Sequence, residues 1–285
     1  MSGLTTLLES RSHNTALFNK DLWSANASFN KSRIKNQISS LWMDKNDKSG
    51  VLIAAGPSLK QSIPEIKALN RSLNEIVCVD MALNFLLQNG VAPDYVLCAD
   101  SSKDISSTLV KSPKEVSLIL NVIVDSNTAK DWAGDIYWFC MMSNYYDREA
   151  GDFMQFDHQK KSGVSSFLVP GGNVSSLGVS FLSGIRACRE ILLYGHDFCW
   201  ENDDEFYAGG VRSDLAGQRI SSESESGTVL DVSASCGRRV KTTGSLMSFR
   251  DWYQETDRMI PGLLVQRTPT TILEIGGNKN ESARI

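Results

Sequence analysis

The fold is decided by residues 51–58, Val51-Leu52-Ile53-Ala54-Ala55-Gly56-Pro57-Ser58, where a short unbroken apolar run ends in a glycine, a proline and a serine. The amphipathic stretch 59–69 follows directly. Apolar runs of this length, bounded by glycine and proline, are typical of strands that are buried on both faces of a parallel sheet. The segment therefore predicts a buried strand, a tight turn and a helix.

The same unit recurs along the chain. A second strand is expected at 76–79 with a helix at 82–88, and a third strand at 95–99. Later strands are expected at 117–124, 136–140 and 190–194, with a helix at 174–187 before the last of them. This alternation predicts an α/β fold with a doubly wound, mostly parallel, Rossmann-like sheet and helices on both faces.

Three parts of the chain differ in composition. Residues 1–47 are expected to form a helical lead-in, residues 48–260 the α/β core, and residues 261–285 a C-terminal tail. Within the core, the polar segment 201–245 indicates an excursion or lid, and residues 245–259 predict a closing helix.

Charge and hydropathy disfavour several classes of protein. The formal net charge is −4 and the two signs are interspersed, so no strong field would hold a polyanion and nucleic acid is not an expected partner. No window reaches the roughly 18 apolar residues of a membrane span, and residues 1–14 lack the apolar core of a signal peptide. We therefore expect a cytoplasmic protein without a membrane span, for which a homo-oligomer is possible.

The six cysteines, at positions 78, 98, 140, 188, 199 and 236, form no close pair. Several lie in apolar runs, which indicates buried, reduced thiols. No spacing typical of a zinc site occurs, so no cysteine metal site is expected.

The first candidate site is the turn after the first strand. Gly56 lets the chain turn and a ligand approach the backbone, Pro57 presets the first helical turn, and Ser58 offers a hydroxyl and an amide. An anion such as a phosphate fits this geometry. A plain helix cap explains the same residues equally well.

Polar residues also follow the next two strands. Asp80 ends the second strand with Asn84 one helical turn later, and Asp100 and Ser101 end the third. Such carboxylates can bind a ribose, accept a proton or hold Mg²⁺. Asp80 is also explained as a helix N-cap, whereas for Asp100 we favour a functional role.

A second glycine-rich turn, Gly171-Gly172-Asn173, opens the helix at 174–187 together with Ser175. It is a second candidate cradle for a phosphate or sugar. The strand at 190–194 then ends in Gly195-His196-Asp197. A histidine and an aspartate here could form an acid/base pair, although a capping aspartate beside an incidental histidine fits as well.

Four segments together form an ordered set: Ala-Ala-Gly-Pro-Ser-Leu-Lys at 54–60, Gly-Val-Ala-Pro-Asp at 90–94, Pro-Gly-Gly-Asn-Val at 170–174 and Glu-Ile-Leu-Leu-Tyr-Gly-His-Asp-Phe at 190–198. The set resembles the MptE-like family, which includes the archaeal 6-hydroxymethylpterin diphosphokinase and the central domain of the motility accessory factors. It is also similar to the bacterial sialyltransferases that use a CMP-sugar. The resemblance covers about residues 48–260.

The resemblance implies a nucleotide pocket. Gly56, Pro57 and Ser58 would contact donor phosphates, Gly171, Gly172 and Asn173 would lie in the pocket, and Asp197 would line the same cleft. The sialyltransferases use a histidine in their lid region, but segment 201–245 contains none. The general base is therefore unassigned.

Three functions follow from the resemblance. The first is a glycosyltransferase that moves a nonulosonic acid from a CMP donor to a glycan, protein or small alcohol and requires no cofactor. The second is an ATP-dependent diphosphokinase acting on a pterin-like alcohol, in which Asp100 and Asp104, with Asp80 and Asp94, would hold Mg²⁺. The third is a nucleotide-binding module without catalysis.

Overall fold

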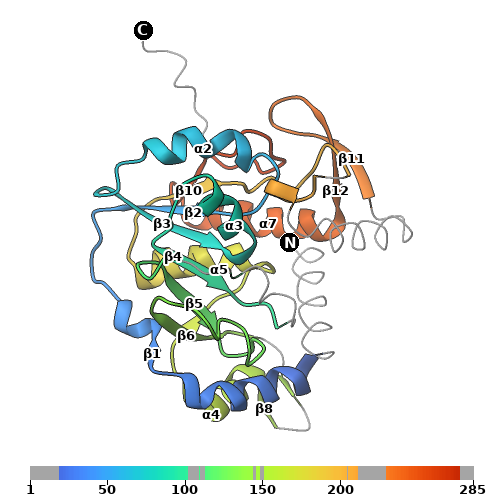
Figure 1. Ribbon diagram of the computed structural model, residues 1–285. Helices are drawn as coiled ribbons and strands as arrows, with labels where there is room; N and C mark the ends of the chain where they lie inside the picture. The colour runs from blue at the N-terminus through green and yellow to red at the C-terminus, as the bar shows by residue number, and fades with distance from the viewer. Residues whose placement is uncertain are drawn as a thin grey trace.

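A computed structural model describes residues 19–101, 109, 113–143, 146–147, 151–203, 205–210 and 229–276 (Figure 1). Among these residues, nine strands form one sheet in the spatial order β1-β6-β5-β4-β3-β2-β10-β13, with β9 paired to β6. The strand pairs of this sheet are parallel. The strands are β1 (Asn36–Gln37), β2 (Ser49–Ile53), β3 (Asn74–Val79), β4 (Tyr95–Cys98), β5 (Ser117–Asn121), β6 (Ile136–Met141), β9 (Phe167–Leu168), β10 (Ile191–Tyr194) and β13 (Leu264–Gln266).

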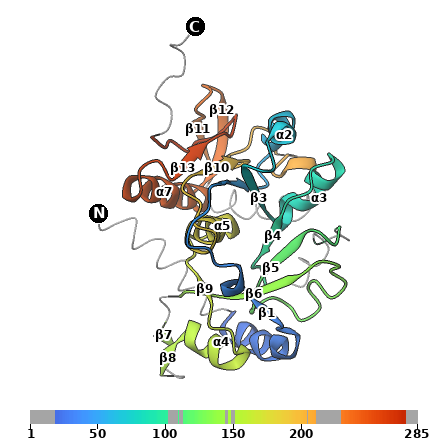
Figure 2. The same cartoon turned by 90° about the vertical axis from the view of Figure 1, so that its left-hand side faces the viewer.

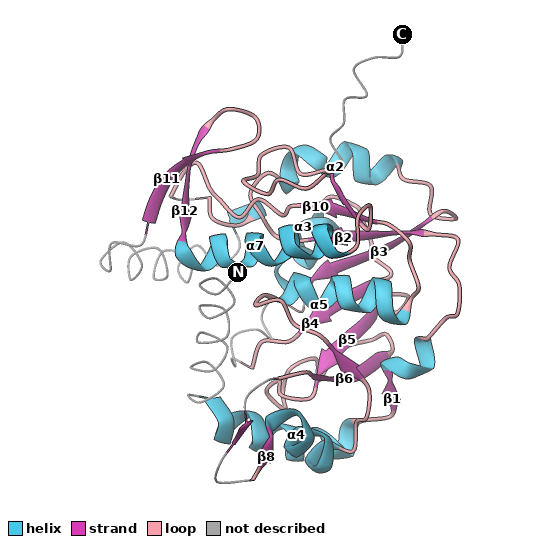
Figure 3. Cartoon of the chain, turned by 180° about the vertical axis from the view of Figure 1, so that it is seen from behind, coloured by secondary structure: helices cyan, strands magenta, loops and turns pink. Residues whose placement is uncertain are grey.

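Helices cover both faces of this sheet. One face carries α2 (Leu59–Ala68) and α3 (Asp80–Gln88), and the other carries α5 (Val174–Ser180), the π-helix η4 (Phe181–Ile185) and α7 (Gly244–Met259). Figure 2 shows α5 and α7 on one side of the strands and α2 and α3 on the other, and Figure 3 shows α5 and α7 from behind. The doubly wound, Rossmann-like α/β fold predicted from the sequence is confirmed.

The two faces have separate cores because side chains alternate along each strand. In β2, Val51 and Ile53 belong to the core under α2 and α3, whereas Leu52 between them belongs to the core under α5 and α7. All three side chains are fully buried. The unbroken apolar run that predicted this strand therefore reflects burial on both faces.

The order of the strands contains a topological switch point. From β2 the chain proceeds through β3, β4, β5 and β6 toward one edge, whereas β10 lies on the opposite side of β2. In open α/β sheets, ligands bind beyond the carboxyl ends of the strands at such a point. We therefore expect a ligand site at the turns after β2 and β10.

The sheet extends beyond the predicted core range of 48–260 at both ends. In the lead-in, a helix at residues 19–30 buries Trp23 and Ala27 in the core under α2 and α3, and β1 pairs with β6. In the expected tail, β13 pairs with β10. Strands of two and three residues carry too little periodicity to be recognised in a sequence.

The remaining elements lie outside the sheet. They are η1 (Lys31–Arg33), η2 (Ile38–Leu41), β7 (Tyr146–Asp147), β8 (Asp152–Phe153), α4 (Met154–Ser162), η5 (Ala208–Gly210), β11 (Val229–Ser233) and β12 (Arg239–Thr243). Strands β11 and β12 form an antiparallel hairpin within the predicted lid segment 201–245, of which residues 211–228 lie outside the described part of the chain.

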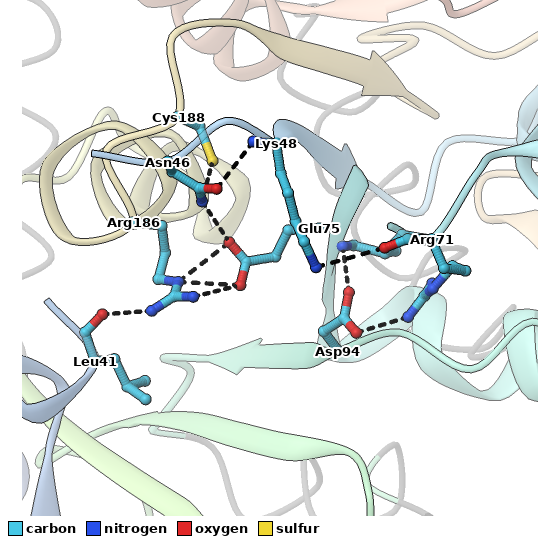
Figure 4. Close-up of polar contacts among 9 residues, drawn as sticks. Leu41, Asn46, Lys48, Arg71, Glu75, Asp94, Arg186 and Cys188 are labelled. Atoms are coloured by element: carbon cyan, nitrogen blue, oxygen red, sulfur yellow. Dashed lines mark hydrogen bonds and ion pairs between the residues drawn. The ribbon is translucent and has the colours of Figure 1, made fainter. Parts of the chain in front are cut away.

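The amino-terminal edge of the sheet carries a polar network (Figure 4). Glu75, at the start of β3, accepts hydrogen bonds from Arg186 Nε at 3.0 and 3.1 Å and from Asn46 Nδ2 at 3.3 Å. Arg186 also donates to the Leu41 carbonyl. Since ligands of this fold bind at the opposite edge, we interpret the network as structural.

Five cysteines are buried as predicted, whereas Cys236 is exposed. All six are free. Over the part of the chain that the structure describes, no three His, Cys, Asp or Glu side chains are grouped in a way that could hold a metal ion. Nor is any helix in that part long and apolar enough to cross a membrane.

Candidate functional site

The turns after β2 and β10 meet at the switch point. The Gly56 amide donates to the Gly195 carbonyl at 2.9 Å. A side chain at Gly56 would place its Cβ 2.3 Å from Asp197 Oδ1 and 2.5 Å from the Gly195 carbonyl oxygen. Gly195 itself has a φ of 68°, which favours glycine. Both glycines are therefore required for the two turns to approach each other.

Ser58 is joined to Asp197 through two hydrogen bonds. The Ser58 amide donates to Asp197 Oδ2 at 2.7 Å, and the Ser58 hydroxyl donates to Asp197 Oδ1 at 2.7 Å. Both residues are buried. Ser58 occupies the N-cap position of α2 but makes no side-chain capping bond. Its hydroxyl thus binds the turn that follows β10 and does not cap the helix.

This arrangement changes the interpretation of the Gly56-Pro57-Ser58 turn. The amides of Gly56 and Ser58 already have acceptors within the protein, and Pro57 has no amide hydrogen. The turn does not offer the free amide that the sequence suggested. The carboxylate of Asp197 would, when ionised, also repel an anion at Ser58. The turn fits a role in shaping the site better than a role as a phosphate cradle.

The environment of Asp197 brings the pKa of its carboxyl group close to neutral pH. Burial raises the pKa of this carboxyl to about 7, the charge of Glu201 acts in the same direction, and the hydrogen bonds from Ser58 oppose them. A buried carboxyl of this kind changes its charge near neutrality.

His196 does not pair with Asp197. Its backbone amide donates to Thr268 Oγ1 at 3.1 Å, and its Nδ1 lies 3.0 Å from the Tyr194 carbonyl oxygen. Since a carbonyl only accepts, Nδ1 carries the hydrogen and Nε2 is an acceptor, for which the described residues provide no partner. Burial lowers the pKa of His196 to about 3, so the ring is neutral.

The acid/base pair considered from the sequence is therefore not formed. The His196 ring packs against Tyr253 of α7, with a centroid distance of 5.3 Å, and against Phe198. The Asp197 carboxylate instead faces Ser58. The physical reason is that adjacent side chains of an extended chain point to opposite sides, so His196 contacts Tyr253 whereas Asp197 contacts Ser58.

The second glycine-rich turn is a capped helix start. The Gly171 amide donates to Ser176 Oγ at 2.6 Å, and Asn173 is the N-cap of α5, accepting from the Ser176 amide at 2.9 Å. A Cβ at Gly171 would lie 2.2 Å from the Trp252 ring. Of the paired glycines, only Gly172 is exposed, with a φ of 97°. The amide of Gly171 is therefore not available to a ligand.

Asp80 and Asp100 are near the buried thiol of Cys98. Burial raises the pKa of Cys98 well above its usual value, and both carboxylates raise it further. Asp80 is buried as the first residue of α3 and accepts from the Met81 amide, while Val79 holds the N-cap position. Asp100 and Asn84 are half-buried. Asp100 is thus the more accessible of the two carboxylates.

Ser101, directly after Asp100, accepts a hydrogen bond of 2.8 Å from Trp23 Nε1. The lead-in helix therefore reaches the carboxyl edge of the sheet. No sequence pattern predicts this contact, because the two residues are 78 positions apart.

Another carboxylate of the magnesium hypothesis, Asp94, is placed differently. Asp94 lies before β4 at the amino edge, where it accepts from the Ile76 amide and pairs with Arg71 at 2.7 Å. It cannot join Asp100 at the carboxyl edge, so its assignment to a shared metal site is wrong. Asp104 lies outside the described residues.

The comparisons with known proteins agree with this fold. A family model described as 6-hydroxymethylpterin diphosphokinase MptE-like matches residues 23–203. Among solved structures, a MAf glycosyltransferase from Magnetospirillum magneticum AMB-1 matches with a TM-score of 0.62 and 18% sequence identity. The match covers 90% of this chain and 37% of that chain, and shows that the fold is shared. No curated protein sequence matches the chain.

Proposed function

The chain belongs to the MptE-like family, and from this premise we propose that it is a nucleotide-dependent transferase, namely a glycosyltransferase that uses a CMP-nonulosonate donor. The fold that it shares with a MAf glycosyltransferase supports the proposal at the level of architecture. Because one fold hosts many chemistries, the support for this activity comes from the family together with the arrangement of side chains at the carboxyl edge.

The observation that carries the proposal is the placement of the candidate residues around the switch point. Asp100 and Ser101 are half-buried at the end of β4, two strands from the closed turn at Ser58. We assign Asp100 to accept hydrogen bonds from hydroxyl groups of the ribose or the sugar, as carboxylates do at this edge of other α/β sheets. Asn84 on α3 would contribute from the neighbouring strand end.

On the other face, Gly172 and Asn173 are the accessible members of the second turn. We propose that they contact the nucleotide. The main catalytic effect would be stabilisation of the negative charge on the departing phosphate. Asp197 and His196 are both enclosed, so in this proposal they position the turns and do not touch the substrate.

A diphosphokinase is the second candidate, favoured by the description of the matching family model. This reaction needs Mg²⁺ to bridge the phosphates of ATP. Asp100 would hold the ion together with Asp104, and the metal would supply charge neutralisation at the transferred group.

We also propose a cytoplasmic location. All six cysteines are free, and reduced thiols are the rule in the cytosol. Cell fractionation of the tagged protein tests this part of the proposal.

The decisive experiment is a thermal shift assay with CMP, CDP, UDP, GDP and ATP, each with Mg²⁺ and with EDTA. A ligand that binds only the native state raises its melting temperature. A CMP-selective shift that persists in EDTA supports the glycosyltransferase. A shift with ATP that requires Mg²⁺ supports the diphosphokinase, and no shift with any of these ligands supports a non-catalytic module.

A further inference from the structure

Tyr253, in α7, contacts the first turn of α5 and the residues that follow β10. Its hydroxyl lies 2.8 Å from the Ser175 hydroxyl in the first turn of α5. Its ring lies edge-on against His196 at the end of β10, with a centroid distance of 5.3 Å and an interplanar angle of 65°. The side chain is fully buried between these two elements. One residue of α7 therefore connects two segments that the sequence separates.

On the side of α5, the contacts continue into the Gly171–Asn173 turn. The Ser175 hydroxyl also lies 3.2 Å from Asn173 Oδ1, which caps the helix. The neighbouring Trp252 ring fills the space in front of Gly171. Helix α7 thus fixes the start of α5 through two adjacent aromatic residues.

On the side of β10, the Tyr253 ring also packs against Phe198, with a centroid distance of 5.4 Å. Phe198 has a φ of 53°, a conformation that a bulky residue adopts only where its surroundings impose it. Asp197 lies between His196 and Phe198 in the chain. Packing on both neighbours therefore fixes the direction of the carboxylate that holds Ser58.

We propose that Tyr253 is a positioning residue, which holds the Gly171–Asn173 turn and the buried Gly195–Phe198 turn in a single arrangement, so that Gly172 and Asn173 meet a nucleotide-sugar donor in one geometry. The inference rests on the proposed function for its ligand, but the coupling between the turns is a property of the protein alone. Because Tyr253 is buried and acts through other residues, its loss weakens donor binding and leaves the chemical step unchanged.

The test uses Tyr253→Phe, which keeps the ring and removes the hydroxyl. Tyr194→Phe is the matched control, because Tyr194 is equally buried and its hydroxyl donates to Glu65 on α2 at 2.7 Å. Hydrogen exchange is measured at residues 172–176 and 195–198 without ligand, and the Kd for CMP by calorimetry. We expect faster exchange in both segments for Tyr253→Phe alone, and a Kd for CMP raised roughly five- to tenfold, the effect of one buried hydrogen bond.

Two results would overturn the positioning role. One is faster exchange confined to 172–176, which a local hydroxyl contact would give. The other is an unchanged Kd for CMP in a Tyr253→Phe protein whose turns both exchange faster. If the wild-type protein does not bind CMP, the proposed donor is wrong, and the exchange pattern in the two variants then decides the coupling by itself.

Discussion

Ser58 and Asp197 are 139 residues apart in the sequence and are joined by two hydrogen bonds of 2.7 Å at the switch point of the sheet. Because the Ser58 amide already donates to Asp197, it is not free to bind a phosphate in the way that the sequence suggested. In the proposed function the ligand therefore contacts the end of β4, two strands away, where Asp100 and Ser101 are half-buried.

The Asp197 carboxyl predicts a specific pH dependence of stability. Its pKa is about 7 in the folded protein and about 4 in an unfolded chain, so between these values the folded state binds the additional proton. Its contribution to the free energy of unfolding is therefore greatest below pH 4 and is lost as the pH rises to 7. The difference in stability between the wild type and Asp197→Asn should fall across this window by on the order of a few kcal/mol.

Urea titrations at several pH values measure this difference. Ser58→Ala, which removes a hydrogen bond to the ionised carboxylate, should move the upper end of the window to higher pH. A difference that is constant from pH 4 to 7 would mean that Asp197 is ionised throughout.

Gly56→Ala should destabilise the protein by about 3 kcal/mol or more, because the added Cβ would overlap Asp197 Oδ1 and the Gly195 carbonyl. Gly184→Ala is the matched control, since no atom lies within 4 Å of the position that its Cβ would take. The control should change the free energy of unfolding by less than about 1 kcal/mol. Equal effects of the two substitutions in chemical denaturation would contradict the close approach of the turns.

Breaking the ion pair of Glu75 and Arg186 at the amino edge (Figure 4) should be costly. Both side chains are largely buried, so Glu75→Gln leaves an unpaired guanidinium and should lower the free energy of unfolding by roughly 3–5 kcal/mol. The more exposed pair of Asp152 and Lys160 provides the comparison, and Asp152→Asn should change the free energy of unfolding much less, because solvent screens this pair. Neither change should alter nucleotide binding, which thermal shift with CMP would verify.

Asp100→Asn should weaken nucleotide binding or turnover about tenfold or more with little change in melting temperature, because it removes a charge-assisted hydrogen bond to the ligand. Asp94→Asn should lower the melting temperature and leave nucleotide binding unchanged. Asp94 lies away from the site, where its carboxylate accepts from the Ile76 amide and pairs with Arg71. Calorimetry and thermal denaturation of the two variants separate the effects. Loss of binding in Asp94→Asn alone would rule out the carboxyl edge as the site.

The sequence predicted the sheet well and the site only in part. Val51 and Leu52 revealed a strand because burial on both faces leaves an unbroken apolar run, and Gly56 revealed a turn because only glycine fits there. The partner of the Ser58 amide could not be predicted, because it depends on the register of β10 beside β2. The surroundings of His196 could not be predicted either, because its ring packs against Tyr253 of α7, which is distant in the sequence.

The position of β10 beside β2 has a consequence for how the chain folds. During synthesis, β2 through β6 leave the ribosome well before β10, so the edge of β2 that pairs with β10 stays unpaired until then. Such late, non-local pairing is slow, and an unpaired apolar edge attracts other chains. We therefore expect chaperone dependence and aggregation of fragments that end before residue 191 to be the characteristic failures of this protein.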